Sequence, residues 1–408
     1  MSANTVPTAP AKRGALSRLY TGTGAFDIVG KRKIWYVSFG LLVLVCILSI
    51  ALRGFNLGID FTGGSQIQMP AAGANGVATT QQVGDVYQRS VGMGAASIQS
   101  AGTGSSASIL IRSEALSEAQ VIALKQALFD AFQPLGSNGQ PSAEVISDSA
   151  VSGTWGGEIT RQAIIALAVF LVLVTAFLAF YFERSMAIAA LVALVHDVVV
   201  TAGVYSIVGF EVTPSTVIGL LTILGFSLYD TVVVFDKVKE NARGILGLTR
   251  RNYSEIANLA VNQTLMRSIN TSLIAVLPVL GLMIVGVGLL GVGTLADLAL
   301  VQMVGIIAGS LSSLLLATPL LVDLKMRDPK YQQQAKRVAA RRARQATARG
   351  AGTDAPEATD DESIAQELRR EKALSAAAST PARAQRAAGR PQGKSGRPGG
   401  RPSGKRNR

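Results

Sequence analysis

Asp230 is the residue with the clearest chemical potential, because it is a carboxylate within an apolar run that begins near Thr213. A carboxylate at membrane depth costs roughly 2.5 kcal/mol or more, so it should face protein or water, and such residues often carry protons or ions. Asp236, at the start of the next charged run, fits a simpler role at the cytoplasmic headgroups. Asp230 lies almost two helical turns earlier and has a short side chain, which favours a functional role.

Two further groups could share this chemistry. His196 and Asp197 are adjacent in another apolar run, and His196 is the only histidine in the chain. The pair could relay protons, because an imidazole titrates near neutral pH, or it could hold helices together as a buried hydrogen-bonded pair. Arg267 stands at the start of a third run. It either anchors the chain at the inner membrane boundary or approaches Asp230 and stabilises its ionised form.

The elements that must position these groups are membrane spans. The chain is 49% hydrophobic and 16% charged, too apolar for an ordinary soluble domain, and its apolar residues come in long blocks. Windows of about 19 residues predict six spans, at 34–52, 162–182, 186–208, 213–235, 269–287 and 298–322. The segment 237–266 mixes polar and apolar residues as an amphipathic helix at the inner surface would. Asp297, at the outer boundary, is expected to be exposed to solvent.

The basic residues indicate how the chain is oriented. Most of the net charge of +13 lies in residues 323–408, which hold 21 Lys and Arg against 9 Asp and Glu. The residues before the first span and after the fourth are also rich in Lys and Arg, which predicts cytoplasmic amino and carboxyl termini. Residues 54–160 hold three basic and eight acidic residues, as an exported segment should.

The tail composition predicts disorder. Its charge suits anionic lipid or ribosomal RNA, and lipid is the simpler partner because the membrane is adjacent. The expected division of the chain is a cytoplasmic leader, a first helix, an exported domain, a five-helix bundle and a disordered basic tail, at 1–33, 34–52, 53–160, 161–322 and 323–408.

The exported segment predicts a small α+β domain. Strands at 66–69, 96–100, 107–112 and 143–146 alternate with a helix at 80–91 and a second helix that Ser117 opens. The order β-α-β-β-α-β is that of the ferredoxin-like fold. We find no nucleophile–base pair and no metal-ligand spacing in this segment, so we expect a binding or mechanical role, without a cofactor or a metal ion.

A glycine-containing segment at 55–69 joins the first span to this domain. Apolar and polar residues alternate along it as in a strand, and its adjacent glycines allow a tight turn or a close backbone approach. The residues of interest are Gly58, Asp60, Phe61, Gly63 and Gly64.

Three stretches, 55–64, 225–236 and 267–272, together with the order of one span, an exported domain and five spans, resemble the SecD/SecF family of protein-export membrane proteins. The resemblance covers about residues 30–325 and implies a half bundle like that of the resistance-nodulation-division (RND) superfamily, in the bacterial cytoplasmic membrane. It implies pairing with SecD in a twelve-helix bundle, and inward proton flow that helps unfolded preprotein through the SecYEG channel.

The same resemblance assigns roles to the residues singled out above. Asp230 matches the proton carrier of the family, Arg267 matches its functional arginine, and His196 with Asp197 matches its His-Asp pair. The partner carboxylate expected from SecD belongs to another chain.

Other classes of protein fit less well. A proton-coupled RND-type small-molecule exporter usually carries both halves and two large exported domains in one chain, whereas this sequence has one half and a single small domain. A membrane scaffold would leave Asp230 and Arg267 without a reason for their positions. An enzyme is the weakest alternative, because the sequence shows no nucleophile–base or metal constellation.

Overall fold

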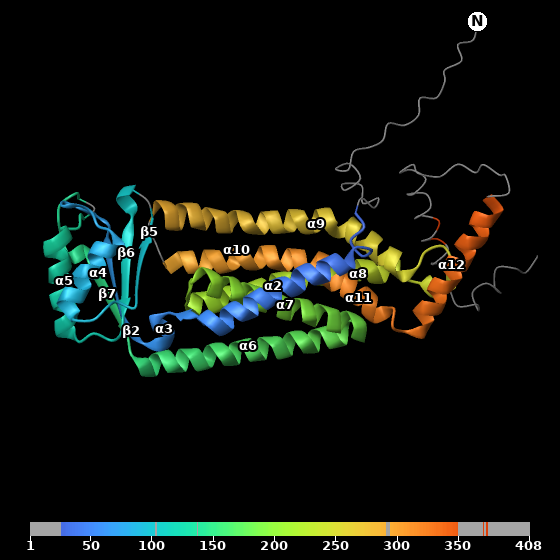
Figure 1. Cartoon of the computed structure of the whole chain (residues 1–408), viewed down its shortest axis with the longest axis horizontal. Coiled ribbons are helices and arrows are strands. Elements are labelled where there is room, and N and C mark those ends of the chain that lie inside the picture. Colours follow the sequence, from blue (N-terminus) through green and yellow to red (C-terminus); the bar gives the residue numbers. More distant parts are fainter. Residues whose placement is uncertain are drawn as a thin grey trace, which may run out of the picture.

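The computed structural model describes residues 26–349, except 103, 137 and 291–293, together with residues 370 and 373. Within these residues, six segments are long and apolar enough to cross a membrane, as the sequence predicted: Arg32–Arg53, Gly153–Tyr181, Arg184–Val208, Pro214–Gly247, Tyr253–Leu289 and Leu295–Lys325. They form an elongated bundle with an α+β domain at one end, here called the domain end (Figure 1). The chain enters the first helix and leaves the last at the opposite end, here called the far end.

The α+β domain has the ferredoxin-like topology that the sequence predicted. Its sheet has the order β5-β6-β2-β7, and each neighbouring pair is antiparallel. Two helices, α4 and α5, pack on one face through a core that includes Ile67, Met69, Tyr87, Leu124 and Leu128. The elements are β2 (Gly64–Pro70), α4 (Thr80–Val91), β5 (Ser97–Ala101), β6 (Ser108–Ser113), α5 (Glu118–Phe132) and β7 (Ser147–Val151), with short pieces β3 (Ala72–Gly73), β4 (Gly76–Val77) and η1 (Gly104–Ser106).

The termini of both helices follow from their sequences. Thr79 and Ser117 each accept a hydrogen bond from the backbone three residues later, and the glutamine there bonds back, so each helix begins with a complete capping box. The fourth strand was predicted at 143–146, which is wrong. Ser142 caps a short 3-10 turn there, η2 (Ala143–Val145), and the strand follows it.

The bundle has a buried centre and an apolar exterior. The third, fourth and sixth membrane helices are the most buried, whereas the first, second and fifth expose most of their apolar side chains. The helices are α2 (Arg32–Arg53), α6 (Gly153–Tyr181), α7 (Arg184–Val208), α8 (Pro214–Asn241), α9 (Tyr253–Gly281) with its π-helical continuation η4 (Leu282–Leu289), and α10 (Thr294–Ser312), η5 (Ser313–Ala317) and α11 (Thr318–Lys325), which form one last span. Glycines on α10 allow α8 to approach closely, because a Cβ on Gly305 would lie 2.4 Å from Ile223.

The segment 237–266 does not form a separate surface helix, contrary to the prediction. α8 runs on to Asn241, and α9 already begins at Tyr253, after the cap residue Asn252. The first turns of α9 are buried in the core of the bundle, and Tyr253 packs edge-on against Tyr331. Tertiary packing therefore makes this stretch a continuation of the fifth membrane helix.

The predicted disorder of the tail is wrong for residues 329–349, which form helix α12 (Pro329–Arg349). α12 binds the loop between α8 and α9, which includes the turn η3 (Ile245–Gly247). Gln334 donates to the carbonyl oxygens of Leu248 (3.0 Å) and Arg251 (2.7 Å). The hydrogen bonds from Arg342 to Glu255 raise the pKa of that guanidinium. Most of the remaining tail, from residue 350 onward, lies outside the described residues.

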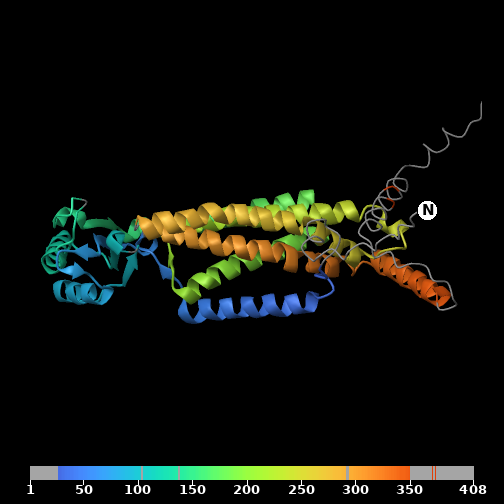
Figure 2. The same cartoon turned by 90° about the horizontal axis from the view of Figure 1, so that it is seen from above.

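Part of the segment predicted as a leader, at 1–33, is held against the bundle at the far end. The side-chain oxygen of Asn258 accepts from the backbone of Ile28 (2.8 Å) and Val29 (3.0 Å). Asn262, one turn later on α9, bonds both backbone groups of Phe26. Figures 1 and 2 both place the start of α2 and helix α12 at the end of the bundle opposite the domain. Residues 1–25 of the leader lie outside the described residues.

Candidate functional site

Asp230 lies inside the bundle, on the buried face of α8, and is 4% exposed. Its two carboxylate oxygens each accept a short hydrogen bond from a serine. Ser268 of α9 donates to Oδ1 at 2.5 Å, and Ser313 of η5 donates to Oδ2 at 2.5 Å. Three different membrane helices therefore meet at this one side chain, and their hydroxyl groups compensate part of the cost of burying the carboxylate.

Ser313 opens the π-helical turn η5, where the last span widens before α11. Such turns insert an extra residue and are frequent at functional sites. The Ser313 hydroxyl also lies 3.0 Å from the carbonyl oxygen of Ser310. A hydroxyl has one proton to donate, so Ser313 has a choice of two acceptors, Asp230 and Ser310.

Arg267 is close to this site but does not bind its carboxylate. Its side chain is exposed, and Nη2 donates to the hydroxyl of Tyr229 at 3.0 Å. Within the part of the chain that the structure describes, no ion pair joins Arg267 to Asp230. Arg267 therefore contacts Tyr229, the residue before Asp230. The contacts to the carboxylate that the sequence suggested for the guanidinium are made by the two serines.

His196 and Asp197 form a second buried polar group, on α7. Nδ1 of His196 lies 3.0 Å from Oδ1 of Asp197, and Ser227 of α8 donates to Oδ2 at 2.5 Å. Phe39 of α2 packs edge-on against the imidazole, with 5.0 Å between the ring centroids. Among the described residues, Nε2 of His196 is buried without a hydrogen-bond partner.

The two buried polar sites meet on one face of α8, through Asp230 itself and through Ser227, which bonds Asp197 of α7. Ser227 and Asp230 are three residues apart, so they occupy successive turns. The last span covers both: Ser313 bonds Asp230, and Gly309, one turn earlier, packs on Ser227, where an added Cβ would lie 2.8 Å from the Cβ of the serine. A change in the charge of Asp230 or Asp197 would therefore affect the packing of α8 against the last span.

The glycine-containing segment forms the junction between the bundle and the domain. Its alternation of apolar and polar residues suggested a strand, but residues 59–62 form a short helix, α3 (Ile59–Thr62), which buries both Ile59 and Phe61. Before it, β1 (Asn56–Leu57) pairs in parallel with β8 (Glu211–Val212), the strand between α7 and α8. Glycine residues terminate α3 on both sides, which explains why an alternating pattern did not produce a strand here.

Gly63 and Gly64 have backbone conformations that favour glycine, with φ of +77° and +143°. They also leave no room for a side chain. A Cβ on Gly63 would lie 2.7 Å from the backbone of Gly153, the first residue of α6, and one on Gly64 would lie 2.4 Å from the carbonyl oxygen of Ser113. The paired glycines therefore let α3, β2 and α6 meet, so the domain is packed tightly onto the bundle. Asp60 is half-buried beside them.

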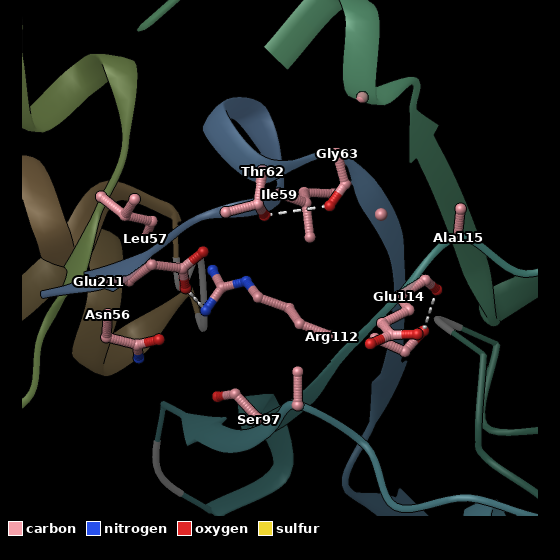
Figure 3. Close-up of a pocket in the computed structure, with 14 residues that line it drawn as sticks. Asn56, Leu57, Ile59, Thr62, Gly63, Ser97, Arg112, Glu114, Ala115 and Glu211 are labelled. Carbon is pink, nitrogen blue, oxygen red and sulfur yellow. Dashed lines mark hydrogen bonds and ion pairs between the residues drawn. The ribbon is translucent and has the colours of Figure 1, made fainter. Parts of the chain in front are cut away.

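A cavity of about 440 Å³ opens at this junction, lined by the glycine-containing segment, β6 and Glu211 (Figure 3). Arg112 of β6 extends across it and forms an ion pair with Glu211. Asp297, expected to be exposed, lies nearby and is buried. Its backbone carbonyl accepts from the hydroxyl of Tyr205 at 2.5 Å, which fixes the start of the last span against α7.

Sequence reasoning missed the partners of the carboxylates. Ser227 and Ser268 lie within the stretches 225–236 and 267–272, whereas Ser313 lies outside these motifs. The available signal was the presence of hydroxyl residues within apolar spans, next to small residues such as Gly309. Arg112 and Glu211 lie far apart in the sequence and gave no signal of their contact.

Six candidate membrane helices among the described residues, with buried carboxylates between them and an α+β domain after the first helix, define a polytopic membrane protein. Comparisons with known proteins show which family it belongs to. Residues 132–327 match the family described as protein export membrane protein SecD/SecF, C-terminal, and residues 48–73 match the SecD/SecF GG motif. The chain belongs to the SecD/SecF family, and the relatives that it matches include SecF subunits.

Two curated relatives and one solved structure illustrate this. Protein translocase subunit SecF of Mycobacterium tuberculosis is 54% identical over 354 residues, which cover 86% of this chain and 79% of that protein. The SecF subunit of Streptomyces coelicolor is 43% identical over 83% of this chain and 87% of its own length. The crystal structure of SecDF, a translocon-associated membrane protein from Thermus thermophilus, matches with a TM-score of 0.63 and 30% identity. The match covers 74% of this chain and 38% of that one, so this chain corresponds to about two fifths of the fused SecDF protein.

Proposed function

We propose that this chain is a proton-coupled subunit of a protein translocase, in which Asp230 gains and loses a proton during each cycle. The observation that supports this most is the pair of serine hydroxyls at the carboxylate, Ser268 on Oδ1 and Ser313 on Oδ2. An arginine in their place would hold the carboxylate ionised, because a guanidinium has only donors. A hydroxyl can both donate and accept, so this site can accommodate both protonation states.

Ser313 supplies the means to change between those states. When Asp230 is ionised, the Ser313 hydroxyl donates to Oδ2. When Asp230 takes up a proton on Oδ2, that proton donates to Oγ of Ser313, and the serine hydrogen turns to the carbonyl oxygen of Ser310, 3.0 Å away. Neither state leaves a buried donor without an acceptor, so uptake and release can occur without unfolding the site.

Proton uptake would change how α8, α9 and the last span attract one another, and so bias a two-state arrangement of these helices. One elementary charge that crosses 100 mV supplies about 2.3 kcal/mol, so we expect several protons for each substantial displacement. Arg267, which binds Tyr229, would then contribute a positive charge to the electrostatic potential at Asp230. The His196–Asp197 pair would stabilise the turn of α8 that contains Ser227.

The exposed apolar faces of α2, α6 and α9 require lipid or another protein, and a SecD subunit is the partner that the family suggests. In this proposal the domain lies on the outer face of the cytoplasmic membrane, where it meets unfolded preprotein leaving the SecYEG channel, and the far end faces the cytoplasm. The exposed basic residues of α12 would then lie near anionic lipid. The other candidate function from the sequence is one half of a small-molecule exporter. The relatives of this chain are named as translocase subunits, which favours protein export.

The test of this function is export from vesicles that contain the SecYEG channel and the SecD subunit, with and without this chain. We expect that adding the chain makes the release of a secreted protein respond to an imposed proton gradient, and that collapsing the gradient removes the gain. A gain that is the same without a gradient would mean that the chain assists export without using protons. Gradient-driven efflux of a small dye by the chain and its partner would favour the exporter.

A further inference from the structure

We infer that Arg112 and Glu211 are positioning residues, whose buried ion pair holds the α+β domain in a fixed orientation on the loop between α7 and α8. Arg112 belongs to the domain, on β6, and Glu211 belongs to the bundle, on β8. Figure 3 shows the arginine pointing out of its sheet toward the glutamate, across the junction. The side chains are only 7% and 3% exposed, so water screens the interaction little.

The domain holds the guanidinium in place from two further strands. Nε of Arg112 donates to the side-chain oxygen of Gln66 on β2 (3.0 Å), and Nη1 donates to that of Gln99 on β5 (3.3 Å). Burial lowers the pKa of Arg112 from its ordinary value, whereas the charges of Asp297 and Asp60 raise it. The carboxylate of Glu211, in ion-pair contact with the guanidinium, favours its charged form. A rigid, ionised guanidinium therefore faces the bundle.

The bundle holds the glutamate just as firmly. β8 pairs in parallel with β1, and the backbone N–H of Gly58 donates to the carbonyl oxygen of Val212 at 2.9 Å. Gly58 also makes room for the carboxylate, because a Cβ there would lie 2.6 Å from Oε1 of Glu211. This gives the first glycine of the family motif a physical role: it allows the backbone to pass close to the glutamate that binds the domain.

The position of Glu211 links this contact to the buried carboxylates. β8 leads directly into Thr213, which caps α8 with a complete capping box, and Pro214 starts that helix. A displacement of α8 therefore moves Glu211 with it, and the ion pair carries Arg112 and the sheet along. This coupling of Asp230 to the domain rests on the proposed function, whereas the positioning role does not.

A buried ion pair has a distinctive mutational signature. Removing one partner leaves an unpaired buried charge, which is worse than removing both. We therefore expect Arg112→Gln and Glu211→Gln each to loosen the domain more than the double variant does. Lys125→Gln is the matched control, because Lys125 and Asp148 form an ion pair within the domain, at 2.8 Å, that does not cross the junction.

The measurement is the distance between spin labels in the full chain, in vesicles that also contain SecD. One label is placed at exposed Gln126 on α5 and the other at exposed Ile284 on η4, across the junction. A second pair at Gln88 and Gln126 reports on the internal fold of the domain. Cys46 is buried, and labelling of the chain without introduced cysteines checks that it does not react.

We expect each single variant to broaden or shift the Gln126–Ile284 distance distribution, the double variant to do so less, and Lys125→Gln to leave it unchanged. The Gln88–Gln126 distribution should stay the same throughout. Single variants that leave the cross-junction distances unchanged would overturn the inference. So would a double variant that disturbs them as much as either single variant does, or singles that also alter the internal distances.

Export by an Asp230→Asn variant, taken together with these distances, separates this inference from the proposed function. If Asp230→Asn leaves gradient-dependent export intact while the distances still depend on Arg112 and Glu211, the proposed function fails and the positioning role stands. If Asp230→Asn abolishes gradient-dependent export but the cross-junction distances are unchanged in the Arg112 and Glu211 variants, the positioning role fails and the proposed function stands.

Discussion

Replacing Asp230 with Asn is expected to remove the gradient-dependent part of protein export completely, while the complex still assembles. Asparagine has nearly the same shape, and its amide can still hydrogen-bond to Ser268 and Ser313, which preserves the packing of the three helices. It cannot exchange a proton under physiological conditions. The measurement is export of a secreted protein from vesicles that contain the partner subunit, with and without a gradient.

Asp236→Asn is the matched control for this experiment. Asp236 lies on the same helix, is half-buried and accepts a hydrogen bond from Tyr181 at 3.2 Å, outside the serine site. We expect export close to that of the unchanged chain. If both substitutions lower gradient-dependent export to the same extent, the effect reflects negative charge on α8 in general and not a proton carried by Asp230.

The second large effect is expected for Ser313→Ala, which should reduce gradient-dependent export more than Ser268→Ala does. Both variants lose a hydrogen bond to a charged group, worth about 1.5–3 kcal/mol, or roughly 10- to 140-fold in an equilibrium constant. Only Ser313 has the second acceptor, Ser310, that allows its hydroxyl to reverse. The loss of Ser313 therefore also removes the partner that accepts from the protonated acid.

The two alanine variants are compared by the dependence of export on the size of the gradient, in the same vesicles. Ser268→Ala should need a larger gradient for the same export, and Ser313→Ala should respond weakly at every gradient. Equal responses of the two variants would show that both serines only donate hydrogen bonds to the carboxylate and that Ser313 has no further role in proton uptake. A threonine at position 313, which keeps the hydroxyl, should restore part of the response.

The sequence was sufficient where local pattern and burial agree. Apolar run length located six spans, and the alternation of strand and helix patterns predicted the ferredoxin-like order of the domain. The depth of Asp230 in its run predicted a carboxylate that faces protein or water, and in the structure it faces protein. In each case the signal lies within one segment, so no knowledge of distant contacts was needed.

The misses arose where a distant segment decides the outcome. Residues 253–266 look amphipathic, but Tyr331 and the bundle core cover their apolar face, so they extend α9. Arg267 has a suitable depth to meet Asp230, yet its side chain points to Tyr229. Ser313 faces Asp230 from the π-helical turn η5, which the sequence did not predict.

The central claim is that Asp230 itself changes protonation state, and infrared difference spectroscopy of the chain with its partner in vesicles tests it most directly. We expect a carboxylic acid C=O band that grows as the pH falls, is absent in Asp230→Asn, persists in Asp236→Asn and shifts in Ser313→Ala, because Ser313 is its hydrogen-bond partner. A spectrum in which Asp230→Asn removes no pH-dependent carboxyl band would contradict the claim, since the carboxyl would then keep one protonation state throughout.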